Sequence, residues 1–96
     1  MASADRAAIV ALLEDVESAH GNYETNTLGG VRDDAWPQWY ASYLLEHGLA
    51  EQLNSPNLTT ERLASRLVEL DGDYRRTHPN VPWTEFYAER LAAGVA

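Results

Sequence analysis

The chain has 96 residues, of which 45% are hydrophobic, and this length and composition suit one domain with a packed core. It contains no cysteine, which excludes disulfides, thiolate metal sites and cysteine nucleophiles. The formal net charge of -8 opposes binding to nucleic acid and to anionic lipid, and the longest apolar run, residues 7–13, is too short to span a membrane.

Two helices are predicted in the first half of the chain. Apolar residues recur at spacings of three and four over residues 9–23, which is the stripe of an amphipathic helix. An irregular segment follows at about residues 25–32. Aromatic and apolar residues at helical spacing then predict a second helix, which Asp33 or Asp34 is expected to cap and Gly48 to end.

Two further helices are predicted in the second half. The apolar stripe returns over residues 63–74, where Thr59 or Thr60 is the expected N-terminal cap and Pro79 lies just beyond the end of the helix. The last helix is expected at about residues 82–93. No strand is predicted, because no segment alternates apolar and polar residues with a period of two.

The two halves of the sequence repeat each other. Residues 36–44 and residues 83–91 both read W-x-x-W/F-Y-A-x-x-L. Upstream of these segments, the run H-G-N-Y at residues 20–23 corresponds to D-G-D-Y at residues 71–74. Internal similarity of this kind is the signature of a duplicated structural unit.

The repeat predicts an all-α fold for the single domain over residues 1–96. Its architecture is expected to be a pseudo-symmetric four-helix bundle, made of two tandem helix-loop-helix units at about residues 8–48 and 59–95. An approximate twofold axis would relate the two units. Trp36 and Trp83 would then occupy equivalent places and would both be substantially buried.

One glycine lies inside a predicted helix in each half of the chain. Gly21 and Gly72 each cost about 1 kcal/mol relative to alanine in a helix interior. Their matched positions indicate a reason for keeping them. The preferred interpretation is packing, either at a tight helix crossing or under a tryptophan ring, and the alternative is a site that needs close approach to the backbone.

A group of polar side chains lies near the end of the first predicted helix. The spacings Glu17-x-x-His20 and His20-x-x-x-Glu24 place three potential metal ligands on one side of that helix. A single E-x-x-H resembles half of a di-metal carboxylate site, but the repeat has Val68 and Asp71 at the positions corresponding to Glu17 and His20. A polar helix edge is therefore preferred, and no metal or other cofactor is expected.

The repeat also pairs residues of opposite charge. His20 corresponds to Asp71, and Glu24 corresponds to Arg75. Across a twofold axis the members of each pair could meet. A His–Asp pair could serve as a general base or as a contact that specifies the fold.

The aromatic side chains of the second and fourth predicted helices have two interpretations. At helical spacing they most often form the core. Alternatively, they line a ligand pocket into which hydroxyl and indole groups point. On that second interpretation the candidate ligand-binding residues are His20, Tyr23, Glu24, Trp36, Tyr40 and Asp71.

No dinucleotide-binding, P-loop, serine-hydrolase or zinc-protease motif is present, so no catalytic residue is assigned and a non-enzymatic function is favoured. The run H-G-x-Y-E at residues 20–24, W-P-x-W-Y-A at residues 36–41 and H-G-L at residues 47–49 is similar to a group of small bacterial helical proteins with no established activity. The resemblance implies a helical fold and a bacterial origin. The use of arginine for all seven basic residues also indicates a GC-rich bacterial genome.

Two functions from different classes follow. The leading hypothesis is a small acidic, cytoplasmic protein-interaction or regulatory module, with a protein partner and a homodimeric state expected. The alternative is a small-molecule or metal-binding helical bundle, or an enzyme, with its site near the end of the first helix and the 25–32 loop. Convergence of His20, Tyr40 and a carboxylate on a cavity would favour the alternative.

Overall fold

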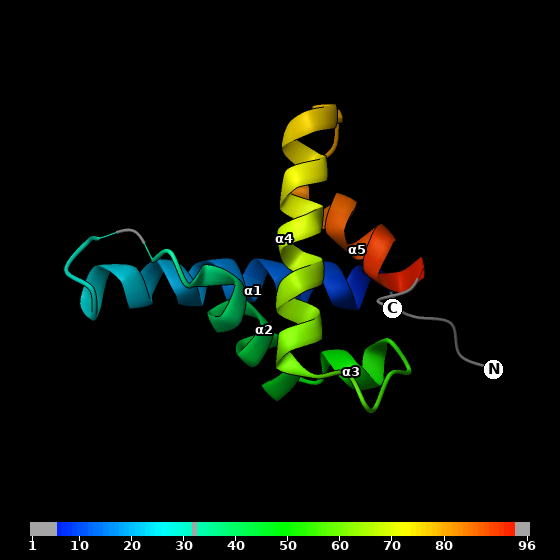
Figure 1. Cartoon of the computed structure of the whole chain (residues 1–96), viewed down its shortest axis with the longest axis horizontal. Coiled ribbons are helices and arrows are strands. Elements are labelled where there is room, and N and C mark those ends of the chain that lie inside the picture. Colours follow the sequence, from blue (N-terminus) through cyan, green and yellow to red (C-terminus); the bar gives the residue numbers. More distant parts are fainter. Residues whose placement is uncertain (1–5, 32, 94–96) are drawn as a thin grey trace.

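The computed structural model of the chain describes residues 6–31 and 33–93, and this part contains helices and no strand. The all-α prediction is therefore confirmed, with a fifth, short helix that was not predicted (Figure 1). Within the described residues, none of the helices combines the length and apolar character that crossing a membrane requires. The helices are α1 (Arg6–Asn26), α2 (Trp36–Glu46), α3 (Leu49–Gln52), α4 (Thr60–Thr77) and α5 (Trp83–Ala93).

The additional helix α3 follows directly from the stop signal of α2. Gly48 has a φ of 93°, a left-handed conformation that glycine adopts without steric cost, and it ends α2 as predicted. The same residue is the N-cap of α3, so the chain turns and continues as one more helical turn. Leu49 is fully buried, which fixes α3 on the core.

The ends of α4 agree with the sequence, whereas the start of α2 does not. Thr59 is the N-cap of α4, and its side-chain oxygen accepts a hydrogen bond from the Arg62 N–H at 3.2 Å. The expected aspartate cap of α2 is wrong, because Ala35 occupies the N-cap position without a side-chain bond. The Asp33 carboxylate instead accepts a hydrogen bond from the Ala35 N–H at 2.9 Å, which shapes the turn before the helix.

The helices of the two halves pack on each other. Among the described helices, α2 with α4 and α1 with α5 form the most extensive contacts, and α1 and α2 also contact each other. In Figure 1, α4 runs across the direction of α1. The core lies between these helices and contains the buried residues Ile9, Leu13, Val16, Ala41, Leu44, Leu49, Leu63, Ala64, Leu67, Leu70, Phe86, Tyr87, Ala88 and Leu91.

The packing interpretation of the two helix glycines is wrong. Gly21 and Gly72 are both exposed, and a Cβ atom added at either would meet nothing within 4 Å. Neither residue has a left-handed backbone that would require glycine.

Replacement of these glycines by alanine is therefore expected to stabilise the protein. Gly21→Ala and Gly72→Ala should each raise the free energy of unfolding by up to about 1 kcal/mol, because alanine has the higher helix propensity and the side chain has space. Urea denaturation followed by circular dichroism measures the change. Gly48→Ala is the control, since its left-handed backbone should make that substitution destabilising. A loss of stability in both helix variants would contradict the argument.

Candidate functional site

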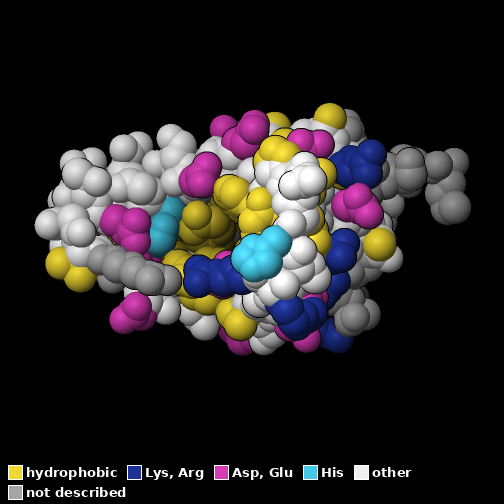
Figure 2. Space-filling view, turned by 90° about the horizontal axis from the view of Figure 1, so that it is seen from above, with side chains coloured by type: hydrophobic (Ala, Val, Ile, Leu, Met, Phe, Trp, Pro, Cys, Tyr) yellow, Lys and Arg dark blue, Asp and Glu magenta, His cyan; other side chains and the backbone are white. Residues whose placement is uncertain are grey.

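A pocket of about 370 Å³ opens where α1, α2, α4 and α5 meet, and we call it the aromatic pocket. Figure 2 shows the molecule hollowed beside the upper end of α4, with hydrophobic side chains inside and charged side chains at the rim. Two other depressions, of about 440 and 600 Å³, are each lined by parts of two helices and the segment beside them. The aromatic pocket is lined by Glu17, Trp36, Tyr40, Asp71, Tyr74, Arg75, Trp83 and Tyr87.

Two pairs of aromatic rings form the walls of the aromatic pocket. Trp36 and Tyr40 meet edge to face with ring centroids 5.3 Å apart and an interplanar angle of 80°. Trp83 and Tyr87 repeat this arrangement at 5.0 Å and 77°. Such edge-to-face pairs are favourable and hold both rings in fixed orientations. Each tryptophan packs against the core with most of its surface buried, in agreement with the repeat, and its remaining exposed side faces the pocket.

The charged side chains of the aromatic pocket are held by neighbours from other turns or helices. The indole N–H of Trp83 donates to the Glu17 carboxylate at 3.2 Å, which joins α5 to α1. Arg75 donates through Nε to the Asp71 carboxylate at 3.2 Å along one face of α4. The pocket therefore presents two carboxylates and one guanidinium that is already paired.

Two of the three tyrosines that line the aromatic pocket, Tyr40 and Tyr87, have hydroxyls whose pKa is raised, so both stay protonated at neutral pH. Burial raises the pKa of Tyr40 to about 12, and the negative charges of Glu17 and Glu24 add to this effect. Burial also raises the pKa of Tyr87, with the Asp71 carboxylate as the next cause. The Tyr40 hydroxyl is therefore available as a hydrogen-bond donor, whereas the Tyr87 hydroxyl is engaged by the Asp71 carboxylate.

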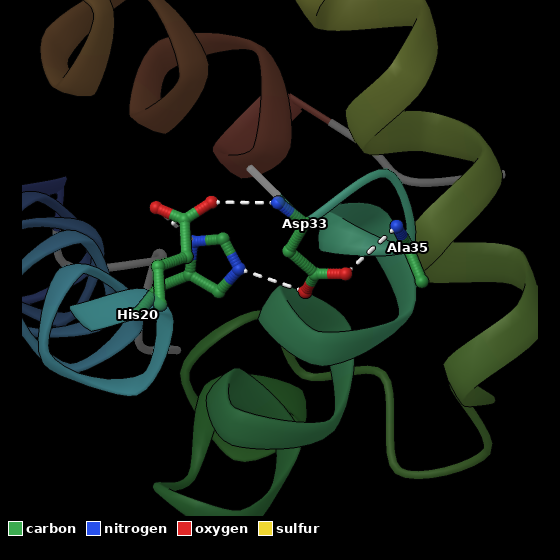
Figure 3. A network of polar contacts seen from close by, with 4 residues as sticks. His20, Asp33 and Ala35 are labelled. Atoms are coloured by element: carbon green, nitrogen blue, oxygen red, sulfur yellow. Dashed lines mark hydrogen bonds and ion pairs between the residues drawn. The ribbon is translucent and has the colours of Figure 1, made fainter. Parts of the chain in front are cut away.

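A polar network next to the aromatic pocket fixes the loop between α1 and α2 (Figure 3). The Nε2 atom of His20 lies 3.0 Å from the Asp33 carboxylate, and the Asp33 N–H donates to the Glu24 carboxylate at 2.9 Å. The other ring nitrogen of His20 lies 3.9 Å from Glu24. The hydrogen bond with His20 is the main reason that the pKa of Asp33 lies below its ordinary value.

The His20 ring is buried among aromatic rings. Its centroid lies 5.0 Å from Trp39, 5.0 Å from Tyr40 and 6.0 Å from Tyr23. Only Tyr40 of these neighbours lines the aromatic pocket. Because a carboxylate faces each ring nitrogen, the geometry favours a contact that fixes the loop over a general base that acts on a substrate.

The predicted ligand-binding residues fall into two neighbouring groups. Trp36, Tyr40 and Asp71 line the aromatic pocket. His20 and Glu24 belong to the loop-fixing network, and Tyr23 packs on the rings of His20 and Trp39. The structure therefore brings half of the predicted set into one pocket and places the other half beside it.

The charge pairs expected across the twofold axis are not the ones observed. His20 pairs with Asp33 rather than Asp71, because the loop before α2 folds back on α1. Asp71 pairs with Arg75 of its own helix, one turn away.

The weak metal candidate made of Glu17, His20 and Glu24 also does not form. Over residues 6–31 and 33–93, no three His, Asp or Glu side chains are grouped so that they could hold a metal ion. Glu17 points instead to the Trp83 indole of α5, and Glu24 binds the backbone of the loop.

Some residues of the site were not among the predicted ligand-binding residues. Trp83 and Tyr87 belong to the aromatic set that the pocket interpretation included, and both line the aromatic pocket. No sequence pattern identified Asp33 as the partner of His20, since an aspartate before a helix normally indicates a cap. Tyr74 follows the apolar stripe of α4 and was assigned to the core.

Comparison of the chain with protein-family models, with curated proteins and with solved structures finds no match. The resemblance to small bacterial helical proteins stays a prediction. The functional argument therefore depends on the geometry of the aromatic pocket.

Proposed function

We propose that the protein binds a small organic molecule in the aromatic pocket. The observation that carries this proposal is the convergence of five aromatic rings and three charged side chains from four helices on one opening of about 370 Å³. Ligand sites are typically concave and largely apolar, with a few polar groups that orient the ligand. The aromatic pocket has this composition.

Polar groups available to a ligand support the proposal. In the described part of the chain, the Tyr40 hydroxyl and the Trp36 indole N–H have no protein hydrogen-bond partner. Neither atom is fully enclosed, since no buried side-chain polar atom lacks a partner there. Donors of this kind at the mouth of an aromatic pocket can orient a bound molecule.

We further propose that the four long helices form a pseudo-symmetric bundle, with α3 inside the connection between its halves. The repeat matches α1 to α4 and α2 to α5. Under this match the contact of α2 with α4 corresponds to the contact of α5 with α1, and these are the two most extensive helix contacts. Burial supports the same correspondence: Ala41 and Ala88 are buried at matched positions, as are Leu44 and Leu91. The pocket then lies between the halves, each of which contributes one tryptophan–tyrosine pair.

No contact among the described residues bears on the prediction that the protein is a protein-interaction module. A protein partner, a homodimeric state and a cytoplasmic location remain predictions. The site of the small-molecule alternative moves from the end of the first helix and the 25–32 loop to the junction of the four long helices. The proposed role is binding, because the buried histidine is engaged by carboxylates beside the pocket.

The indole N–H signals of the three tryptophans provide the test. In nuclear magnetic resonance spectra of the labelled full chain, members of a fragment library with neutral, cationic and anionic compounds should shift the signals of Trp36 and Trp83. The Trp39 signal is the internal control, because this side chain lies on the same helix as Trp36 but outside the aromatic pocket. Trp36→Ala should remove the binding while its circular dichroism spectrum stays helical.

A library in which no compound shifts the Trp36 and Trp83 signals would refute the proposal. Shifts confined to Trp39 would do the same, since they would place binding in the depression beside Tyr23 and Tyr43. Native mass spectrometry of the purified protein gives independent support if a bound molecule leaves when Trp36 is replaced.

A further inference from the structure

We infer that the ligand class of the aromatic pocket is an organic ammonium cation with a compact apolar body. This inference rests on the proposed function and adds the sign of the ligand's charge. Two observations carry it: the orientation of the aromatic walls and the distribution of charge around them.

The aromatic walls form two corners of the kind that surround a cation. Within each corner the rings of a tryptophan and a tyrosine are nearly perpendicular, at 80° in one half and 77° in the other. Tyr40 of the first corner lies 6.4 Å from Trp83 of the second, so the corners adjoin. The face of an aromatic ring is negative, and a cation within about 6 Å of several such faces is attracted to each of them.

The formal charges around the aromatic pocket also favour a cation over an anion. Glu17 and Asp71 contribute two negative charges, and Arg75 contributes one positive charge. Arg75 is paired with Asp71 at 3.2 Å, and within residues 6–31 and 33–93 the Glu17 carboxylate has the neutral indole N–H of Trp83 as its partner and no cation. An ammonium ion placed here would gain a carboxylate partner, whereas an anion would face the unbalanced charge.

The environment of the tyrosine hydroxyls agrees with this charge distribution. Burial is the main cause of the raised pKa of Tyr40, and the negative charges of Glu17 and Glu24 add to it. For Tyr87 burial is again the main cause of the raised pKa, Asp71 adds to it and Arg75 opposes it. The whole chain carries a formal net charge of -8, which further favours the approach of cations. The apolar remainder of the pocket suits the alkyl groups of an organic cation better than a hydrated metal ion.

Choline and two molecules of nearly the same shape test the inference. In neohexyl alcohol a carbon atom replaces the charged nitrogen of choline. In the tert-butylacetate ion a negatively charged carboxylate also replaces the terminal CH2OH group. Titrations of the labelled full chain, read at the Trp36 and Trp83 indole signals, should give an affinity for choline about tenfold higher than for neohexyl alcohol. The tert-butylacetate ion should bind more weakly than either.

Two charge variants on α1 locate the effect. Glu17→Gln should weaken choline binding by about threefold to tenfold more than it weakens the binding of neohexyl alcohol. Glu14→Gln removes the same charge one turn away, outside the aromatic pocket, and should leave both affinities unchanged. An equal effect of the two variants would overturn the inference, because it would show attraction by net charge only.

The remaining outcomes separate this inference from the proposed function. Equal affinities for choline and neohexyl alcohol, or tighter binding of tert-butylacetate, would overturn the cation preference and leave ligand binding in the pocket intact. Failure of all three probes to shift the Trp36 and Trp83 signals would overturn the inference. The fragment library would then decide the proposed function on its own.

Discussion

Leu44→Ala and Leu91→Ala are each expected to lower the free energy of unfolding by about 2–5 kcal/mol. Leu44 is 0% exposed and Leu91 is 1% exposed, so either substitution leaves a cavity that close-packed neighbours fill only in part. A domain of this size is stable by about 5–15 kcal/mol, which makes the loss a large fraction of the total. Urea denaturation, followed by circular dichroism and by tryptophan fluorescence, measures the change.

The same pair of variants bears on the proposed duplication. Leu44 and Leu91 occupy matched positions in the repeat, on α2 and α5, and should give losses of similar size. Val68→Ala is the control for a large apolar side chain on the surface, since Val68 is 52% exposed, and its effect should stay within about 0.5 kcal/mol. A loss below about 1 kcal/mol in either leucine variant would show that its helix is not packed as described.

His20→Ala is expected to lower the free energy of unfolding by about 2–4 kcal/mol. The substitution opens a void among the rings of Trp39 and Tyr40, and it leaves the Asp33 carboxylate without its histidine partner. Urea denaturation gives the loss, and the Trp39 indole signal reports the local change. His20→Asn retains a hydrogen-bond donor and should recover part of the stability. Equal losses in both variants would indicate that ring packing, and not the hydrogen bond to Asp33, holds the loop.

Asp33→Asn tests the same network from the other side through its pH dependence. Since the pKa of Asp33 is lower than 3.8 in the folded state, the charged carboxylate stabilises the fold above pH 3.8. This contribution is lost as the pH falls through the lowered pKa. Unfolding curves between about pH 2 and pH 6 should therefore show a smaller acid-induced loss of stability in Asp33→Asn than in the unchanged chain.

The connection between this network and the aromatic pocket is the Tyr40 ring. His20 meets it edge to face, and Tyr40 in turn forms the corner with Trp36. Loss of His20 should therefore affect the Trp36 indole signal as well as that of Trp39. The network is a positioning element for the pocket, and its contribution to binding comes through Tyr40.

The sequence by itself determined the helical class and most of the helix ends. These features depend on residues three or four apart, or on a single cap or stop, and such local interactions are encoded without reference to the rest of the chain. The Thr59 cap and the left-handed Gly48 are examples, and both were predicted correctly. The helical spacing also grouped Trp36 and Tyr40 on one aromatic stripe, for which the core was the preferred interpretation and a pocket the alternative, and both residues line the aromatic pocket.

Only the tertiary structure decided which distant residues meet. The partner of His20 depends on the path of the loop before α2, which brings Asp33 to it, while Asp71 stays with Arg75. The membership of Trp83 and Tyr87 in the pocket depends on how the second half packs on the first. Only the packed helices show that a Cβ atom at Gly21 or Gly72 would meet nothing within 4 Å. Periodicity places a residue on a helix face, but it does not say whether another helix covers that face.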